Sequence, residues 1–185
     1  MTDEITTPHA ALRGRIGWLC RVLQALVVGW PIWILYIIFA YWGDRAFVVK
    51  KIREMFDIDV SGAAQFQITE TVSMQLVLWT VLAAMCFSLW RVLSLYLRGD
   101  IFSIDAALWL RRAGLFGLVA TIADLPSRSL IVLIMAQHLP ESAMKHRGYI
   151  SSDDPLHLMI ALIVIAFAHI QKSAAEIAAD HAQIV

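Results

Sequence analysis

The sequence predicts an all-α membrane protein with four transmembrane helices, a short amphipathic helix in the first loop and an amphipathic C-terminal extension. Hydrophobic residues make up 59% of the 185 residues and charged residues only 16%, whereas a soluble domain is about half apolar and about a quarter charged. The apolar residues are grouped in four long segments with polar residues between them. Several of the seven tryptophans lie at the ends of these segments, as in the aromatic belt of a membrane protein.

The first span is expected at about residues 17–42, after a short polar lead-in. Its apolar part, from Val22 to Trp42, has about the 20 residues needed to cross the hydrocarbon core. This run is too long for the apolar region of a signal peptide, and no small-residue cleavage motif follows it, so we expect it to remain as an anchor. Pro31 predicts a kink, which neighbouring helices can accommodate by satisfying the freed carbonyl.

Residues 43–73 are expected to form an extracytoplasmic loop that contains one short helix. Apolar residues recur there at helical spacing, at Val48, Ile52, Met55 and Phe56. Charged residues lie on the other side of the same helix. The pattern is typical of an amphipathic helix that lies on the membrane surface. A helix that caps the bundle through the same face fits the pattern equally well.

The second and third spans are expected at about residues 74–96 and 106–137, joined by a tight turn. Gly99 suits the left-handed position at the end of one helix, and Ser103 suits the N-cap of the next. Asp105 complements the positive end of that helix. These features predict a cytoplasmic hairpin that offers a contact surface. Its candidate residues are Arg98, Gly99, Asp100, Phe102, Ser103, Arg111 and Arg112.

The fourth span is expected at about residues 156–172, after a second polar loop. That loop ends in Asp153-Asp154-Pro155, and an acidic N-cap followed by proline is a typical helix start. The helical pattern continues past the apolar residues through Ile177. Residues 173–185 are therefore expected to project from the membrane as an amphipathic cytoplasmic tail.

A polar cluster in the third span is the main candidate for chemistry. Asp124 and Arg128 are four residues apart, so their charged groups can meet on one helix face. A charge at bilayer depth costs on the order of 2.5–3.5 kcal/mol, so we expect the pair to face the other helices. Small residues on the same stripe favour close helix packing there, namely Ala113, Gly117, Ala120 and Thr121.

Two interpretations of this cluster remain open. It is either a polar site for a proton, an ion or a small ligand, or a self-neutralising pair that fixes helix register, with Ser127 and Ser129 as satisfied neighbours. His169 in the fourth span is a further candidate member. A lone histidine within a membrane is, however, more often a residue that hydrogen-bonds one helix to another.

Other chemistry finds no support in the sequence. The histidines and the two cysteines, Cys20 and Cys86, do not have the spacing of a metal site, and the cysteines are expected to be small buried residues. There is no P-loop, Gly-x-Gly-x-x-Gly or Gly-x-Ser-x-Gly motif, so we expect neither a cofactor nor an enzyme. The net charge is zero, with 15 basic and 15 acidic residues, which gives no reason to expect nucleic acid as a partner.

The positions of lysine and arginine favour an orientation with both ends in the cytoplasm. The basic residues that would then be cytoplasmic are Arg13, Arg15, Arg21, Arg91, Arg98, Arg111, Arg112 and Lys172. Those outside would be Arg45, Lys50, Lys51, Arg53, Lys145 and Arg147. The first set is larger and lies closer to the helix ends, where the positive-inside rule counts charges most.

Two stretches resemble DUF2975, a bacterial membrane family of unknown function. Residues 95–114 resemble its hairpin, in which a turn of the form Arg-Gly-acidic-apolar-Phe-Ser/Thr precedes a basic pair and a glycine. The tail from His169 to Val185 is similar to the end of these proteins, an amphipathic helix with a final valine. The resemblance implies a four-helix protein of the bacterial inner membrane. It assigns no role to Asp124 or Arg128.

The sequence therefore favours a small non-enzymatic membrane protein that acts as a regulatory, sensory or assembly partner. Its partners would be the lipid bilayer and either another membrane protein or a second copy of the chain, contacted through the hairpin and the tail. The alternative is a small transporter or channel component that uses Asp124 and Arg128. Four short helices enclose little volume, so such a component would have to form oligomers.

Overall fold

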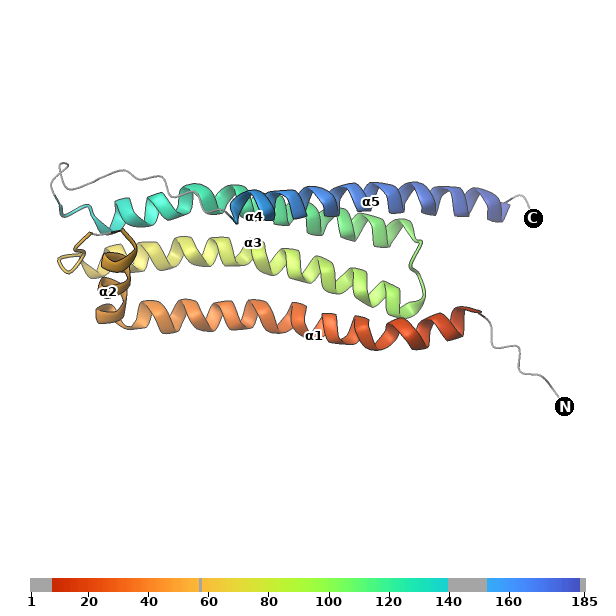
Figure 1. The fold of residues 1–185 in the computed structure, drawn as a ribbon, viewed down its shortest axis with the longest axis horizontal. Coiled ribbons are helices and arrows are strands. Elements are labelled where there is room, and N and C mark those ends of the chain that lie inside the picture. Colours follow the sequence, from red (N-terminus) through yellow and green to blue (C-terminus); the bar gives the residue numbers. More distant parts are fainter. Residues whose placement is uncertain (1–7, 57, 140–152, 184–185) are drawn as a thin grey trace.

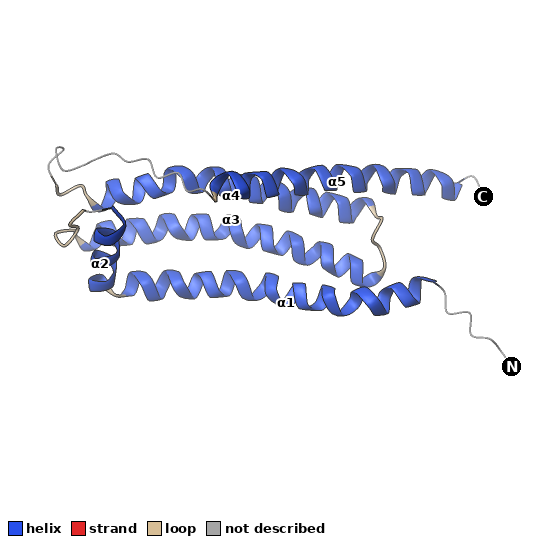
Figure 2. Ribbon diagram, viewed as in Figure 1, coloured by secondary structure: helices blue, strands red, loops and turns tan. Residues whose placement is uncertain are grey.

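The computed structural model describes residues 8–56, 58–139 and 153–183. These residues form five α-helices and no strand (Figure 1): α1 (Pro8–Gly43), α2 (Arg45–Phe56), α3 (Gln65–Arg98), α4 (Ile104–Met135) and α5 (Asp154–Gln183). Figure 2 shows that short loops join the helices within the described residues. Four of the helices, all except α2, are long and apolar enough to cross a membrane. The predicted fold class is confirmed.

The four long helices run antiparallel in an open bundle. The extensive contacts join α1 to α3, α3 to α4 and α4 to α5, and no comparable contact joins α1 to α5 within the described residues. The start of α1, the turn between α3 and α4 and the end of α5 lie at one end of the molecule, which we call the hairpin end. α2 and the segment 58–64 lie at the opposite end (Figure 1), which we call the α2 end.

The outer surfaces of the long helices are apolar. Large side chains such as Trp30, Phe39 and Phe167 are between 56% and 60% exposed. Only 6% to 17% of each candidate span is buried inside the protein. Hydrocarbon must therefore cover most of these surfaces, because so much apolar area is not left exposed to water.

The best-packed core lies at the α2 end. Val48 and Ile52 of α2 pack there with Val60, Ile68 and Met135, and none of the five is more than 5% exposed. α2 therefore caps the bundle through its apolar face, which is the second of the two alternatives that the sequence left open. The side chains of the other two predicted apolar positions, residues 55 and 56, lie outside the described residues.

The start of α3 differs from the expected span. The helix begins at Gln65 rather than near residue 74, so the predicted loop of residues 43–73 contains its first turns. Gln67 holds this start in place: its Oε1 accepts a hydrogen bond from the Ala64 N–H at 2.6 Å, and its Nε2 donates to the Ile134 carbonyl at 2.8 Å. Hydropathy marks where the apolar residues begin, and it does not detect a polar helical turn that precedes them.

The turn between α3 and α4 has the predicted helix-capping residues. Gly99 adopts a left-handed conformation with φ of 96°, and the Asp100 N–H donates to the Leu95 carbonyl at 3.1 Å, as in a Schellman motif. The Ser103 hydroxyl accepts from the Ala106 N–H at 3.1 Å and so caps α4. Local sequence alone therefore predicted this hairpin correctly.

α5 is displaced along the bundle relative to α4. It begins at Asp154, beside the middle part of α4, and its other end extends past the hairpin (Figure 1). Gln171 fastens α5 to the hairpin, because its Nε2 donates to the Ile101 carbonyl at 2.6 Å and its Oε1 accepts from the Tyr96 hydroxyl at 3.3 Å. The predicted tail is helical through Gln183 and continuous with the fourth span. Residues 184 and 185 lie outside the described residues.

Small residues allow α4 and α5 to approach closely. Ala113 is 2% exposed, and a Cβ added at Gly117 would meet the Ala161 Cβ at 3.8 Å. The tightest contact is at Gly114, where an added Cβ would lie 2.6 Å from Ile165 Cγ1 and 3.1 Å from the Ile165 backbone nitrogen. The predicted stripe of small residues therefore faces the other helices.

Candidate functional site

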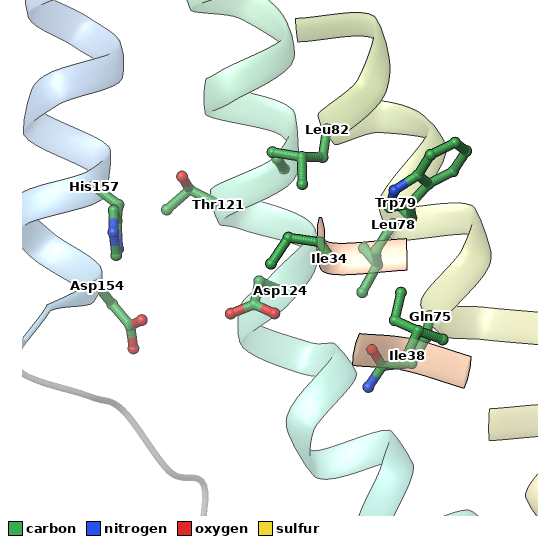
Figure 3. Close-up of a pocket in the computed structure, with 11 residues that line it drawn as sticks. Ile34, Ile38, Gln75, Leu78, Trp79, Leu82, Thr121, Asp124, Asp154 and His157 are labelled. Atoms are coloured by element: carbon green, nitrogen blue, oxygen red, sulfur yellow. The ribbon is translucent and has the colours of Figure 1, made fainter. Parts of the chain in front are cut away.

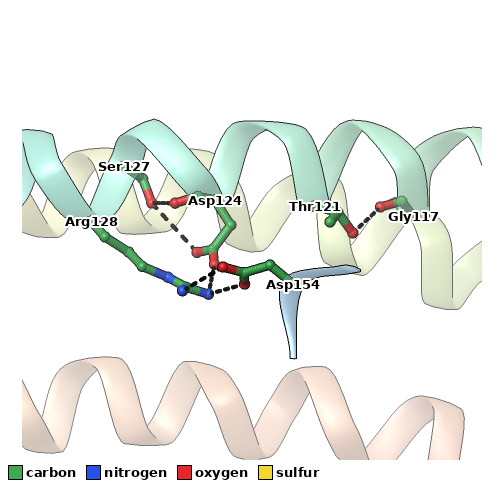
Figure 4. Close-up of polar contacts among 6 residues, drawn as sticks. All are labelled: Gly117, Thr121, Asp124, Ser127, Arg128 and Asp154. Atoms are coloured by element: carbon green, nitrogen blue, oxygen red, sulfur yellow. Dashed lines mark hydrogen bonds and ion pairs between the residues drawn. The ribbon is translucent and has the colours of Figure 1, made fainter. Parts of the chain in front are cut away.

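Arg128 is the centre of a three-residue ionic cluster. Its Nη2 lies 2.5 Å from Asp124 Oδ2 on the same helix, which is the pair that the sequence predicted. The same guanidinium also bonds both carboxylate oxygens of Asp154 on α5, at 3.2 and 2.9 Å (Figure 4). One formal positive charge is thus shared between two carboxylates from different helices.

Ser127 orients the carboxylate of Asp124. Its hydroxyl donates to the Asp124 carbonyl at 2.7 Å and lies 3.4 Å from Asp124 Oδ1 (Figure 4). Ser127 is only 4% exposed, so it is held between helices. These contacts are the ones expected of a satisfied neighbour of the pair.

The two carboxylates of the cluster are in different environments. The Asp154 side chain is 8% exposed, whereas that of Asp124 is 45% exposed. A buried carboxylate needs its counter-charge, because an unpaired buried charge is strongly unfavourable. Asp154 therefore depends on Arg128, while Asp124 remains accessible to a further molecule.

Asp124 and Asp154 line a cavity of about 260 Å³ between the helices (Figure 3). The cavity is open, and α1 and α5 flank it without extensive contact with each other. Its lining consists of Ile34, Ile38, Gln75, Leu78, Trp79, Leu82, Ala120, Thr121, Asp124, Asp154 and His157. Its wall combines apolar side chains with polar groups from three helices, namely Gln75, Thr121, Asp124, Asp154 and His157.

Trp79 connects the cavity wall to α1. Its indole Nε1 donates to the carbonyl of Pro31 at 2.8 Å. Pro31 is the residue at which the sequence predicts a kink in this helix. The hydrogen bond fixes the indole against α1 and satisfies its only polar group. The hydrogen bond therefore joins the α1 and α3 walls of the cavity.

The ionic cluster lies far from the arginines near the hairpin end. From Arg112 to Arg128, α4 rises about 24 Å along its axis. The cluster is at the start of α5, because Asp154 is the first residue of that helix.

The predicted role of His169 in this cluster is wrong. His169 is exposed, and its Nδ1 lies 2.9 Å from the carbonyl of Ile165 on its own helix. Because α5 begins at the cluster, His169 lies about 22 Å further along the helix axis. His157, which sequence reasoning placed only at a helix start, is the histidine that lines the cavity.

The third member of the cluster, Asp154, is not predicted from the sequence, in which it is only part of a helix start. The available signal is an acidic residue directly before the fourth apolar segment. Its pairing with Arg128 follows from the displacement of α5 along α4, which local patterns do not encode.

Among the described residues, no three histidine, cysteine or carboxylate side chains are grouped so that they could hold a metal ion. Cys20 and Cys86 are buried and free.

The predicted hairpin residues separate into two groups. Residues 98–103 form the end of α3 and the turn, where Phe102 is 67% exposed. Arg111 and Arg112 lie two turns into α4, and the Arg112 guanidinium stacks on Trp109 with its Cζ 4.5 Å from the ring centroid. The turn is therefore exposed, whereas Arg112 belongs to an aromatic cluster on the side of the bundle.

No family model matches this chain, and neither a curated protein nor a solved structure matches it. The resemblance to DUF2975 stays a prediction from two stretches of sequence. The function must therefore be inferred from the geometry of the site.

Proposed function

We propose that this protein is a non-enzymatic, multi-pass protein of the bacterial inner membrane that acts as a sensory or regulatory partner. The observation that carries this proposal is the continuity of α5. The helix begins at the cavity, where Asp154 bonds Arg128, and it runs without interruption past the hairpin to Gln183.

α5 provides a direct mechanical link between the cavity and the far end of the molecule. Asp154 and His157 line the cavity, and Gln171 bonds the hairpin. A packed helix responds to a change at one end by moving as a unit. Occupation of the cavity would therefore shift the hairpin and the projecting tail together.

The hairpin end supplies the contact surface for a partner protein or a second copy of the chain. Phe102 in the turn is 67% exposed and Ile177 on the tail is 58% exposed. On the same tail, Lys172 and Glu176 form an ion pair at 3.4 Å. An exposed apolar residue beside charged residues on a projecting helix is typical of a protein contact surface. A helix that only faces solvent would be polar at such a position.

The orientation with both ends in the cytoplasm is supported by the distribution of lysine and arginine. The resemblance to DUF2975 supports the assignment to the bacterial inner membrane. Single-cysteine variants Asp59→Cys and Phe102→Cys test the orientation in intact cells with a membrane-impermeant maleimide. Only Asp59→Cys should react before lysis. Labelling of Phe102→Cys alone would reverse the proposed orientation.

The partner role is tested by photo-crosslinking in the native membrane. A crosslinking residue is placed at Ile177 or Phe102, with Phe39 on the lipid-facing side of α1 as the matched control. We expect a discrete crosslinked protein from the first two positions and not from the third. Equal products from all three positions, or none from Ile177 and Phe102, would contradict a contact surface at the hairpin end.

A small oligomeric transporter or channel component is the second candidate. It is favoured by the cavity itself, in which the partly exposed Asp124 carboxylate lies among apolar residues, because an intramembrane carboxylate is typical of proton and ion pathways. Liposomes that contain the purified protein and a pH-sensitive dye test this alternative. A proton flux that is lost in Asp124→Asn would favour transport over the partner role.

A further inference from the structure

A second polar cluster, separate from the cavity, lies toward the hairpin end. Arg91 of α3 and Arg112 of α4 both contact the indole ring of Trp109, with their Cζ atoms 5.3 and 4.5 Å from its centroid. Such cation–π contacts hold the two guanidinium groups in place, but they do not neutralise them.

Neither arginine has an acidic partner within the described residues. Other cations there do form ion pairs, namely Lys51, Arg53, Arg128 and Lys172. In addition, the Nε of Arg91 is buried and has no hydrogen-bond acceptor. A buried donor without a partner destabilises the folded protein. The cluster therefore has two positive charges and a buried donor that an anion could satisfy.

The surroundings of the cluster are those of the lipid–water interface. Phe87 packs edge-on against Trp109 with ring centroids 5.8 Å apart, and Trp90 stacks on Phe87 at 6.1 Å. Tryptophan gathers at the level of the headgroups in membrane proteins. Phe87 is 53% exposed and Leu108 is 39% exposed, so an apolar surface adjoins the two arginines.

We infer that Arg91, Trp109 and Arg112 bind the phosphate of an anionic membrane lipid. Guanidinium groups bind phosphate oxygens through paired N–H donors, and basic pockets between transmembrane helices are known to hold anionic headgroups. The two arginines would bind the phosphate, and the acyl chains would lie along Phe87 and Leu108. This site does not depend on the cavity or on the proposed partner role.

The test uses the full chain, purified in a neutral detergent and delipidated. Binding is measured by native mass spectrometry and by the shift in melting temperature, with phosphatidylglycerol, phosphatidylcholine or inorganic phosphate added separately. We expect phosphatidylglycerol alone to remain bound and to raise the melting temperature. Arg91→Gln/Arg112→Gln should weaken its binding roughly tenfold or more, because each arginine loses charge-assisted hydrogen bonds.

The matched control is Lys50→Gln/Arg111→Gln, which removes the same charge but spares both contacts to Trp109. It should bind phosphatidylglycerol like the unchanged protein. If the double arginine variant does not accumulate, Arg112→Gln alone gives the same comparison, since Arg112 is exposed and its removal leaves the helix packing intact. Equal stabilisation by phosphatidylcholine, equal stabilisation by inorganic phosphate, or an equal loss in the control would each overturn the proposed lipid site.

Discussion

The Arg128 guanidinium of α4 donates to both carboxylate oxygens of Asp154, the first residue of α5, at 3.2 and 2.9 Å. This bidentate pair joins two helices at the point where α5 begins. It therefore sets how far α5 is displaced along α4, and with it the position of every residue that α5 contributes to the cavity and to the hairpin.

We predict that Asp154→Asn lowers the stability of the protein strongly. The substitution preserves the size of the side chain but leaves the partly buried Arg128 with Asp124 as its only carboxylate partner among the described residues. Breaking a buried pair in this way costs about 3–5 kcal/mol. The measurements are accumulation in the membrane and the melting temperature in detergent. An unchanged melting temperature would show that the pair does not fix α5.

Asp124→Asn should have a much smaller effect on stability. The Asp124 side chain is 45% exposed, and an exposed ion pair contributes about 0–1 kcal/mol. Arg128 would keep both of its bonds to Asp154. We therefore expect normal accumulation together with altered ligand or partner binding, which would identify Asp124 as a working residue. Loss of accumulation would instead identify it as a structural one.

Gly114→Ala should weaken the packing of α5 on α4. The new Cβ would lie 3.1 Å from the backbone nitrogen of Ile165, and backbone cannot move aside as a flexible side chain can. Overpacking of this kind costs about 1–3 kcal/mol. Gly29→Ala is the matched control, because an added Cβ there meets nothing within 4 Å. Equal melting temperatures for the two variants would contradict the close contact.

The α2 end should lose stability in acid through Asp59. The N–H of Ser61 and then the nearby Arg53 lower the pKa of Asp59 below its usual value of 3.8. Because the pKa is lower in the folded protein, this contribution is fully present above the usual value and is lost as the pH falls through the lowered one. Asp59→Asn should remove this pH dependence from the melting temperature. A profile identical to that of the unchanged protein would exclude Asp59 as its source.

The parts of the fold that depend on residues close together in the sequence were predictable. The four apolar spans follow from hydropathy, and the hairpin follows from the conformational needs of Gly99 and the capping hydroxyl of Ser103. The ion pair of Asp124 with Arg128 follows from helical spacing. Each of these features is determined within a few turns of one helix.

The features that the sequence did not predict depend on how far one helix slides along another. Asp154 and His157 reach the cavity, and His169 does not, because α5 starts beside Arg128 and not level with the end of α4. Gln171 meets the hairpin for the same reason. Nothing in the local pattern of α5 determines this shift, which results from the contact of Gly114 with Ile165 and from the bidentate pair.

The gap between α1 and α5 has a consequence for how the cavity is filled. If a molecule enters between these two lipid-facing helices, it would arrive by lateral diffusion in the bilayer. Its occupancy would follow the amount dissolved in the membrane, so strongly partitioning compounds would saturate the cavity at low total concentration. A change in lipid composition would then change the occupancy of the cavity directly and so act as a signal to the protein.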